Sequence, residues 1–171
     1  MGGEKAFSAK LDRNFEEDHY RHDNEPGHHY IYLYNYCNEP WKTQELARKH
    51  VRINYKNSPD GVNGNDDCGQ MSAWYLFSAM GFYPVCPGTD EYVLGTPYFK
   101  EMKLHLENGK TVTISAPNNG DDKRYISSMK LNGKEYTKNY LTHQDLLNGA
   151  SISFKMDAKP NQQRGTKETD F

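Results

Sequence analysis

The sequence predicts an α+β fold, with helices in the first half of the chain and a small antiparallel β region in the second. In the first half, apolar residues recur at near-helical spacing over 40–55 and crowd the segment 69–80. In the second half, short runs alternate apolar and polar residues, which is the period of a strand. We therefore expect a helical part in residues 1–86, a β part in 87–158 and an extended or loose tail in 159–171.

The helical half begins with three apolar residues at helical spacing, which are Phe7, Leu11 and Phe15. The stretch 30–36 is aromatic or aliphatic on almost every side, so it must be buried in whichever secondary structure it adopts. Pro40 suits the first turn of the helix that follows. The cluster 57–61 breaks that helix, and Gly81 with Pro84 just beyond it ends the next one.

Five runs of the second half have strand character, and they cover residues 91–94, 102–106, 111–114, 129–131 and 151–156. Asn108-Gly109 and Asn132-Gly133 are preferred dipeptides of tight hairpin turns. A helical turn is expected at 143–147. Together these patterns predict the small antiparallel sheet.

Charge and hydropathy exclude several classes of protein. The 21 lysines and arginines against 23 aspartates and glutamates give a net charge of −2, so no nucleic-acid-binding surface is expected. No run approaches the roughly 20 apolar residues of a membrane span. Cys37, Cys68 and Cys86 form no C-x-x-C pair, which disfavours zinc and a disulfide scaffold. A mean hydropathy of −1.00 with 13% aromatic residues suits a surface that meets sugars, although polar loops around an ordinary core give similar totals.

Residues that can carry chemistry gather in two loops, 23–29 and 61–70. The second loop contains Asp66 and Asp67, two adjacent carboxylates that repel each other when both are ionised. A cation, a hydrogen bond or a raised pKa relieves such a pair near a cleft. The alternative is helix capping, in which an aspartate accepts hydrogen bonds from the free backbone amides of the helix that follows.

In the first loop, Glu25 is either a hard oxygen ligand for calcium or a structural carboxylate at a helix start or in an ion pair. His28 and His29 are adjacent, so on a helix their rings point about 100° apart and cannot clamp one metal ion. Trp41 and Trp74 lie on helical faces, where either ring can pack in the core or form a platform beneath a sugar. Core packing is favoured for Trp74.

Several longer motifs follow one another along the chain, and they are Asn24-Glu25-Pro26 with His28-His29, 32–36, 40–44, 59–61, 64–67, 69–75 and 81–85. In this order they resemble the family 92 glycoside hydrolases, the α-mannosidases. The resemblance extends from residue 1 to about residue 161, because 131–134 and 151–156 are also similar to the closing β region of that family.

This resemblance implies a calcium-dependent, exo-acting enzyme that removes terminal α-linked mannose, with α-1,2 linkage, from N-glycans or mannan and inverts the anomeric carbon. It implies that residues 1–86 are late helices of an α-helical toroid, an (α/α)6 barrel, and that 87–158 are the β material beside it. The substrate is then a mannose-terminated oligosaccharide, the cofactor is Ca²⁺, and the parent protein is periplasmic or secreted.

By the same resemblance, Asp67 is the general base that activates water, and Asp66 helps to hold the water or the sugar. Asn24 and Glu25 are candidates for the calcium shell. Two further residues are candidates for sugar contacts, and they are His28 and Trp41.

Inverting hydrolysis also needs a general acid, at roughly 6.5–9.5 Å from the base. In the family this acid is a glutamate in an upstream motif that does not occur in this sequence. We therefore expect the isolated chain to be inactive and to need the N-terminal portion of the parent enzyme as its partner. We also expect the apolar rows 30–36 and 71–77 to lack part of their cover and to favour self-association. The alternative is a non-catalytic carbohydrate-binding or structural module.

Overall fold

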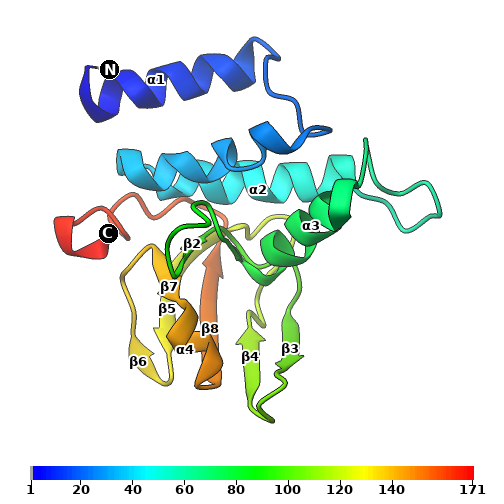
Figure 1. Cartoon of the computed structure of the whole chain (residues 1–171). Coiled ribbons are helices and arrows are strands. Elements are labelled where there is room, and N and C mark those ends of the chain that lie inside the picture. The colour runs from blue at the N-terminus through cyan, green and yellow to red at the C-terminus, as the bar shows by residue number, and fades with distance from the viewer. Residues whose placement is uncertain (1) are drawn as a thin grey trace.

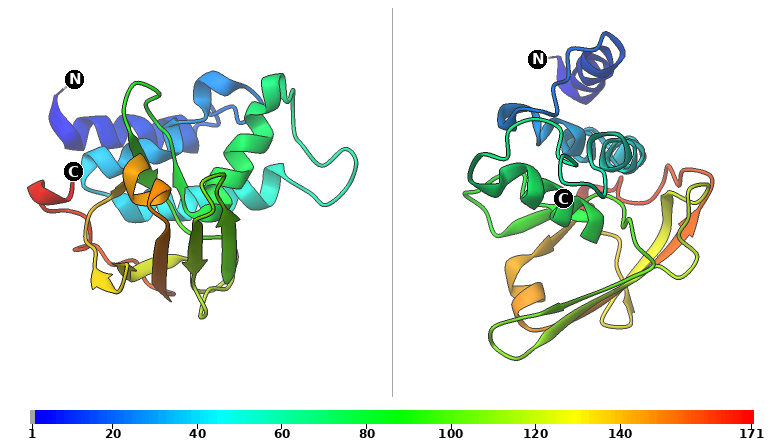
Figure 2. Two further views of the ribbon diagram at one scale, coloured as in Figure 1. Left: turned by 60° about the horizontal axis from the view of Figure 1, so that its bottom comes forward. Right: turned by 90° about the vertical axis from the view of Figure 1, so that its right-hand side faces the viewer.

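The computed structural model describes residues 2–171, and its longest helices form a layer above most of the strands (Figure 1). These longest helices are α1 (Gly3–Glu16), the 3-10 helix η2 (Tyr30–Cys37), α2 (Pro40–Asn54) and α3 (Gln70–Met80). Helix α1 packs on η2, η2 packs on α2, and α2 contacts strand β5 (Tyr125–Leu131). The side view in Figure 2 shows α1 on the far side of the helical layer from the strands.

The predicted helices are confirmed, and their ends follow from their sequences. Pro40 occupies the first turn of α2, where a missing N–H costs no helical hydrogen bond. Gly81 ends α3 in a left-handed conformation (φ 97°), and its N–H bonds the carbonyls of Phe77 and Ser78. Among residues 2–171, no helix has the length and apolar character needed to cross a lipid bilayer.

The aromatic stretch after residue 29 forms η2 and is largely buried by this chain itself. Ile31 and Tyr32 are 0% exposed and Tyr34 is 1% exposed. In the second apolar row, Met71 and Trp74 are also 0% exposed. The expectation that the two rows lack part of their cover is therefore wrong for these side chains, and η2 lies between α1 and α2. Tyr36 and Leu76 stay exposed.

The strands form two sheets. The three-stranded sheet has the order β1 (Phe82–Tyr83), β2 (Glu91–Leu94), β7 (Tyr140–Thr142). The five-stranded sheet has the order β3 (Glu101–His105), β4 (Thr111–Ser115), β8 (Ala150–Asp157), β5 (Tyr125–Leu131), β6 (Lys134–Glu135). Helix α4 (His143–Leu147) starts with a capping box between Thr142 and Asp145. The mixed α+β class and the predicted strands are confirmed.

The prediction of an antiparallel sheet is wrong for one pair of strands. Strand β8 returns to lie between β4 and β5, and its pairing with β4 is parallel, with Val112 opposite Ala150 and Ile114 opposite Ile152. Strand β1 was not predicted, because two residues are too few to show a period of two. It pairs with β2, so the smaller sheet joins residues from both sides of the expected boundary at residue 86. That boundary stays a prediction.

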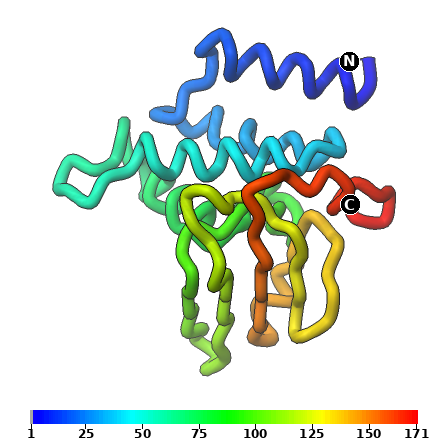
Figure 3. The backbone as a smooth tube through the Cα atoms, turned by 180° about the vertical axis from the view of Figure 1, so that it is seen from behind, coloured from blue at the N-terminus to red at the C-terminus, as the bar shows by residue number. Residues whose placement is uncertain are grey.

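The expectation of an extended or loose tail after residue 158 is wrong. Figure 3 shows this segment lying along the underside of α2. The guanidinium of Arg164 is buried and donates to the carbonyl oxygens of Tyr136 (3.3 Å) and Lys138 (3.1 Å). Asp170 is also buried, and its carboxylate accepts a hydrogen bond from the Thr137 hydroxyl at 2.6 Å. These contacts attach the tail to the segment between β6 and β7.

Two buried histidines, His22 and His28, pack on Trp74, and a third, His50, stacks on His22. The ring of His22 meets the indole edge-on, with centroids 4.3 Å apart, and its Nε2–H donates to the Tyr55 hydroxyl at 2.9 Å. Burial, with a smaller contribution from neighbouring imidazoles, lowers the pKa of His22 to about 3. Burial also lowers the pKa of His50 to about 4. Both rings are therefore neutral at physiological pH.

The tail contact predicts the effect of Arg164→Ala. This change leaves two carbonyl oxygens without their donor, so the free energy of unfolding should fall by about 2–3 kcal/mol. Lys159→Ala, at an exposed position of the same tail, is the matched control and should leave it unchanged. Urea unfolding measures both. Equal stability of the Arg164 variant and the wild type would mean that the tail is detached in solution.

The histidine cluster predicts a loss of stability in acid. Below pH 6.5 the unfolded chain protonates His50 while the folded chain does not, so stability should fall as the pH drops from about 6.5 to about 4. The slope should approach about 1.4 kcal/mol per pH unit for this histidine. His50→Gln should reduce the slope, whereas His105→Gln, at an exposed position, should not. Urea midpoints at several pH values test this, and an unchanged slope in His50→Gln contradicts it.

Candidate active site

The two loops predicted to carry chemistry lie against each other. Gly64 approaches Asp23 so closely that a Cβ atom on it would lie 2.8 Å from the Asp23 carbonyl oxygen, and its φ of 104° also favours glycine. Asn63 ties the second loop to the end of α2 through hydrogen bonds to the backbone and side chain of Asn54. Trp74 donates its indole N–H to the His28 carbonyl oxygen at 3.0 Å. The fold therefore brings the segments of Glu25 and Asp67 together.

Asp66 is held at the start of α3. Its carboxylate accepts hydrogen bonds from the Ser72 backbone N–H at 3.0 Å and from the Ser72 hydroxyl at 2.6 Å. These bonds lower the pKa of Asp66, because they stabilise its charged form. The capping interpretation thus describes what Asp66 does in this structure.

Asp67 lies beside Glu25. The pKa of Asp67 is raised, first by a side-chain hydrogen bond with Glu25 and next by the negative charge of that residue. The side chain is exposed at the surface, whereas Glu25 is half-buried. Two acidic side chains that were predicted separately therefore form one carboxyl pair.

A tight turn presents Asp67. The Gln70 N–H bonds the Asp67 carbonyl oxygen, and the two residues between them have left-handed dihedrals. Cys68 has φ 52° and ψ 24°, and Gly69 has φ 78° and ψ 15°, which are values of a type I′ turn. A left-handed conformation is unfavourable for a cysteine, and backbone strain of this kind concentrates at functional sites.

The carboxyl pair does not supply both catalytic groups of an inverting glycosidase. Such groups stand roughly 6.5–9.5 Å apart on opposite faces of the sugar to admit a water molecule, whereas Glu25 and Asp67 lie side by side and act on each other's charge. Glu17, at the end of α1, is also unsuited to the role of acid. Its pKa is lowered by a hydrogen bond and ion pair with Arg13, and a general acid must stay protonated.

The two predicted sugar-contact residues are His28, which is buried, and Trp41, which lies at the start of α2. His28 is 1% exposed, its Nε2–H donates to the His22 carbonyl oxygen, and its Nδ1 accepts from Gln70. A direct sugar contact by His28 therefore finds no support in this geometry. Trp41 is half-buried in the first turn of α2, about 20 Å along the helix from Asn54.

Oxygen donors for a calcium ion are present, but their number is small. Asn24 is exposed directly before Glu25, and carboxylate and amide oxygens are donors that calcium prefers. In residues 2–171, no three His, Cys, Asp or Glu side chains converge on a position that suits a metal ion. Calcium binds six to eight oxygens. Asn24 and Glu25 therefore fit such an ion chemically as part of a site that further oxygens complete.

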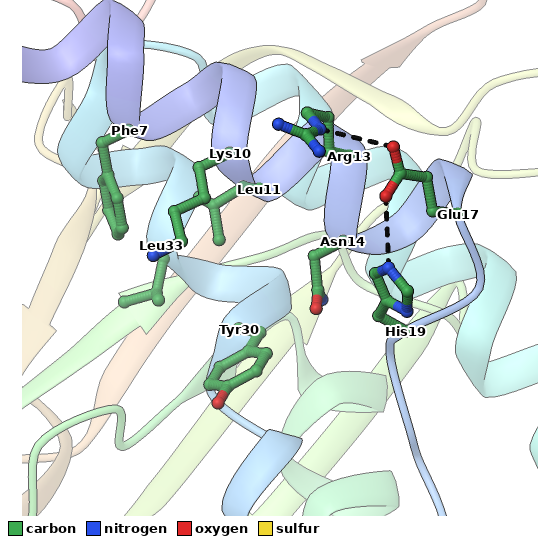
Figure 4. Close-up of a pocket in the computed structure, with 9 residues that line it drawn as sticks. All are labelled: Phe7, Lys10, Leu11, Arg13, Asn14, Glu17, His19, Tyr30 and Leu33. Atoms are coloured by element: carbon green, nitrogen blue, oxygen red, sulfur yellow. Dashed lines mark hydrogen bonds and ion pairs between the residues drawn. The ribbon is translucent and has the colours of Figure 1, made fainter.

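Two grooves open beside the helices. One, of about 450 Å³, lies between α1 and η2 (Figure 4) and is lined by Phe7, Lys10, Leu11, Arg13, Asn14, Glu17, His19, Tyr30 and Leu33. The other, of about 670 Å³, reaches Ser72, the residue that holds Asp66, and its lining includes Tyr55, Tyr75, Tyr98 and Phe99. Sequence reasoning missed Ser72 and this aromatic lining, because they become neighbours only through the fold.

The chain matches the family model described as the glycosyl hydrolase family 92 catalytic domain over residues 1–158. It belongs to this family. A curated relative is the uncharacterized secreted glycosidase of Arthroderma benhamiae, which is 32% identical over 173 residues and of which the match covers 22%, against 99% of this chain.

Solved structures of family 92 enzymes agree with the fold. The α-mannosidase BT3965 of Bacteroides thetaiotaomicron matches with a TM-score of 0.95 and 41% identity, over 98% of this chain and 24% of that one. The inverting mannosidase BT2199 of the same organism matches with a TM-score of 0.91 and 44% identity, over 100% of this chain and 26% of that one. The chain thus spans about a quarter of the length of these family 92 relatives.

The different environments of the two aspartates predict different effects of their removal. Asp66→Ala should lower the urea midpoint of unfolding, because Ser72 at the start of α3 loses its acceptor. Asp67→Ala should not lower it, since the change removes one member of a repelling pair. Asp66→Asn keeps an oxygen acceptor and is the conservative control. Equal losses in the two alanine variants would contradict the separate roles.

Proposed function

We propose that this chain forms the part of an inverting exo-α-mannosidase active site that activates water. The observation that carries the proposal is the exposed Asp67 carboxyl paired with Glu25 in a chain of family 92. A solved relative that is 44% identical over the whole of this chain is described as an inverting mannosidase. The substrate we propose is a terminal α-1,2-linked mannose of an N-glycan or mannan.

In this proposal Asp67 is the general base. Its exposure lets water approach, and its carboxylate takes the proton of the water molecule that attacks the sugar. Asp66, which Ser72 keeps ionised, helps to hold the water or a sugar hydroxyl. A general base must be ionised. In the working site, the pKa of Asp67 therefore has to be lower than the raised pKa that Glu25 causes in this structure.

Glu25 and Asn24 are the residues that we propose for the calcium shell, with oxygens from elsewhere completing it. A bound calcium ion supplies positive charge beside the carboxyl pair and positions for sugar hydroxyls. Glu25 then has two tasks in this chain: it offers an oxygen to the cation and sets the environment of Asp67. The general acid lies in another part of the polypeptide, so the isolated chain is expected to be inactive.

The architecture of the parent enzyme is part of the proposal. Helices α1 to α3 belong to the late part of an α-helical toroid, and the N-terminal portion of the same enzyme packs beside them. The TM-score of 0.95 against a family member of which the match covers 24% supports this arrangement. A periplasmic or secreted location is supported by the relative named a secreted glycosidase. A non-catalytic binding module is not favoured, because the matching family model is that of a catalytic domain.

Mannose release tests the role of Asp67 in the natural polypeptide that carries this chain. With Ca²⁺ and α-1,2-mannobiose, Asp67→Asn should lower the rate by about 10²–10⁴-fold, because the amide cannot accept the proton of water. Asp60→Asn changes an exposed carboxylate of the same loop and should leave the rate unchanged. A fully active Asp67 variant would remove this residue from the mechanism, and a wild type without mannosidase activity would refute the function itself.

A further inference from the structure

The turns that carry the two carboxyls are built alike. In one, the His28 N–H bonds the Glu25 carbonyl oxygen at 3.0 Å, which closes the 3-10 turn Glu25–Gly27. In the other, the Gln70 N–H bonds the Asp67 carbonyl oxygen. Each carboxyl residue thus begins a tight turn, and the residue three positions later closes it.

The closing residues of the two turns bond each other. The Gln70 side-chain amide donates from Nε2 to Nδ1 of His28 at 3.3 Å. The tautomer of His28 suits this bond, because its Nε2–H donates to the His22 carbonyl oxygen at 2.9 Å and leaves the lone pair of Nδ1 free. The two turns therefore meet at the bond between Gln70 and His28, and the residues that begin them are Asp67 and Glu25.

The groups that Gln70 contacts belong to the buried core. His28 is buried, and its carbonyl oxygen accepts the indole N–H of Trp74. The second amide hydrogen of Gln70 goes to the Tyr83 hydroxyl at 2.9 Å. The ring of Tyr83 stacks on Tyr32, with centroids 5.1 Å apart and planes 21° apart. Gln70 thus links the buried core to a turn that is otherwise exposed.

We propose that Gln70 is a positioning residue. Through its bond to His28 it holds the turn of Asp67 against the turn of Glu25 and so fixes the separation of the two carboxyls. The consequence of this positioning for catalysis rests on the proposed function, whereas the positioning itself does not. Without this bond, the Cys68-Gly69 turn can move away from Glu25 and reduce the interaction between the carboxyls.

A double-mutant cycle in this chain measures the positioning directly. Urea midpoints at pH 7 are compared for the wild type, Glu25→Gln, Asp67→Asn and the double variant. In the wild-type background, the double variant should raise the midpoint by less than the sum of the single changes, because each change alone relieves the same repulsion. In the Gln70→Leu background, the changes should become additive.

This readout separates positioning from ordinary stability. A merely structural Gln70 would shift all four midpoints together and leave the non-additivity intact. Tyr83→Phe removes the other partner of the Gln70 amide and should keep the coupling between the carboxyls. Gln144→Leu, a glutamine on α4 that bonds Asn148, controls for the substitution itself. If Gln70→Leu does not fold, Gln70→Met repeats the test with a side chain of similar length.

Every result of the cycle is decisive. Coupling that is lost with Gln70→Leu supports the proposal, and coupling that persists overturns it. Additive changes in the wild-type background overturn it as well, since the carboxyls are then not held together. In the natural polypeptide, Gln70→Leu should also raise the calcium concentration for half-maximal mannose release by about 10–100-fold. Absence of mannose release from the wild type would refute the proposed function and leave the cycle valid.

Discussion

The contact between Trp74 and the segment of His28 is the interaction on which the candidate site depends. The indole is fully buried, stacks on Tyr55 with planes 6° apart, and donates its N–H to the His28 carbonyl oxygen. Because Trp74 lies in α3 and His28 follows Glu25, this buried hydrogen bond attaches the first loop to the helix that follows the second loop. The buried imidazole of His22 completes the packing around the indole.

The electrostatics of the site follow from this attachment. Asp66 and Asp67 are adjacent in sequence, yet Ser72 stabilises the charge on Asp66 while Glu25 opposes the charge on Asp67. The first residue therefore has a fixed charge, and the second has one that its surroundings adjust. Such a division suits chemistry in which one carboxylate orients groups and the other accepts a proton. For the same reason, a cation beside Glu25 would change the pKa of Asp67 more than that of Asp66.

The helices and hairpins could be predicted from the sequence because their determinants are local. Pro40 and Gly81 mark helix ends by their own backbone geometry, and Asn108-Gly109 specifies a tight turn within a few residues. The parallel pairing of β8 with β4 depends on the path of the whole chain, and the burial of Arg164 depends on carbonyls far away in sequence. The loops of the site were located correctly as loops, but their contact joins residues 42 positions apart and has no local pattern.

The pairing of Glu25 with Asp67 is the central claim, and the titration of one carboxyl tests it most directly. The carboxyl ¹³C shift of Asp67 can be followed by NMR against pH in the wild type and in Glu25→Gln. We expect the pKa of Asp67 to lie above its usual value in the wild type and to fall towards that value in the variant, because the hydrogen bond and charge of Glu25 raise it. A pKa of Asp67 at its usual value in the wild type, or one that Glu25→Gln leaves unchanged, would contradict the account.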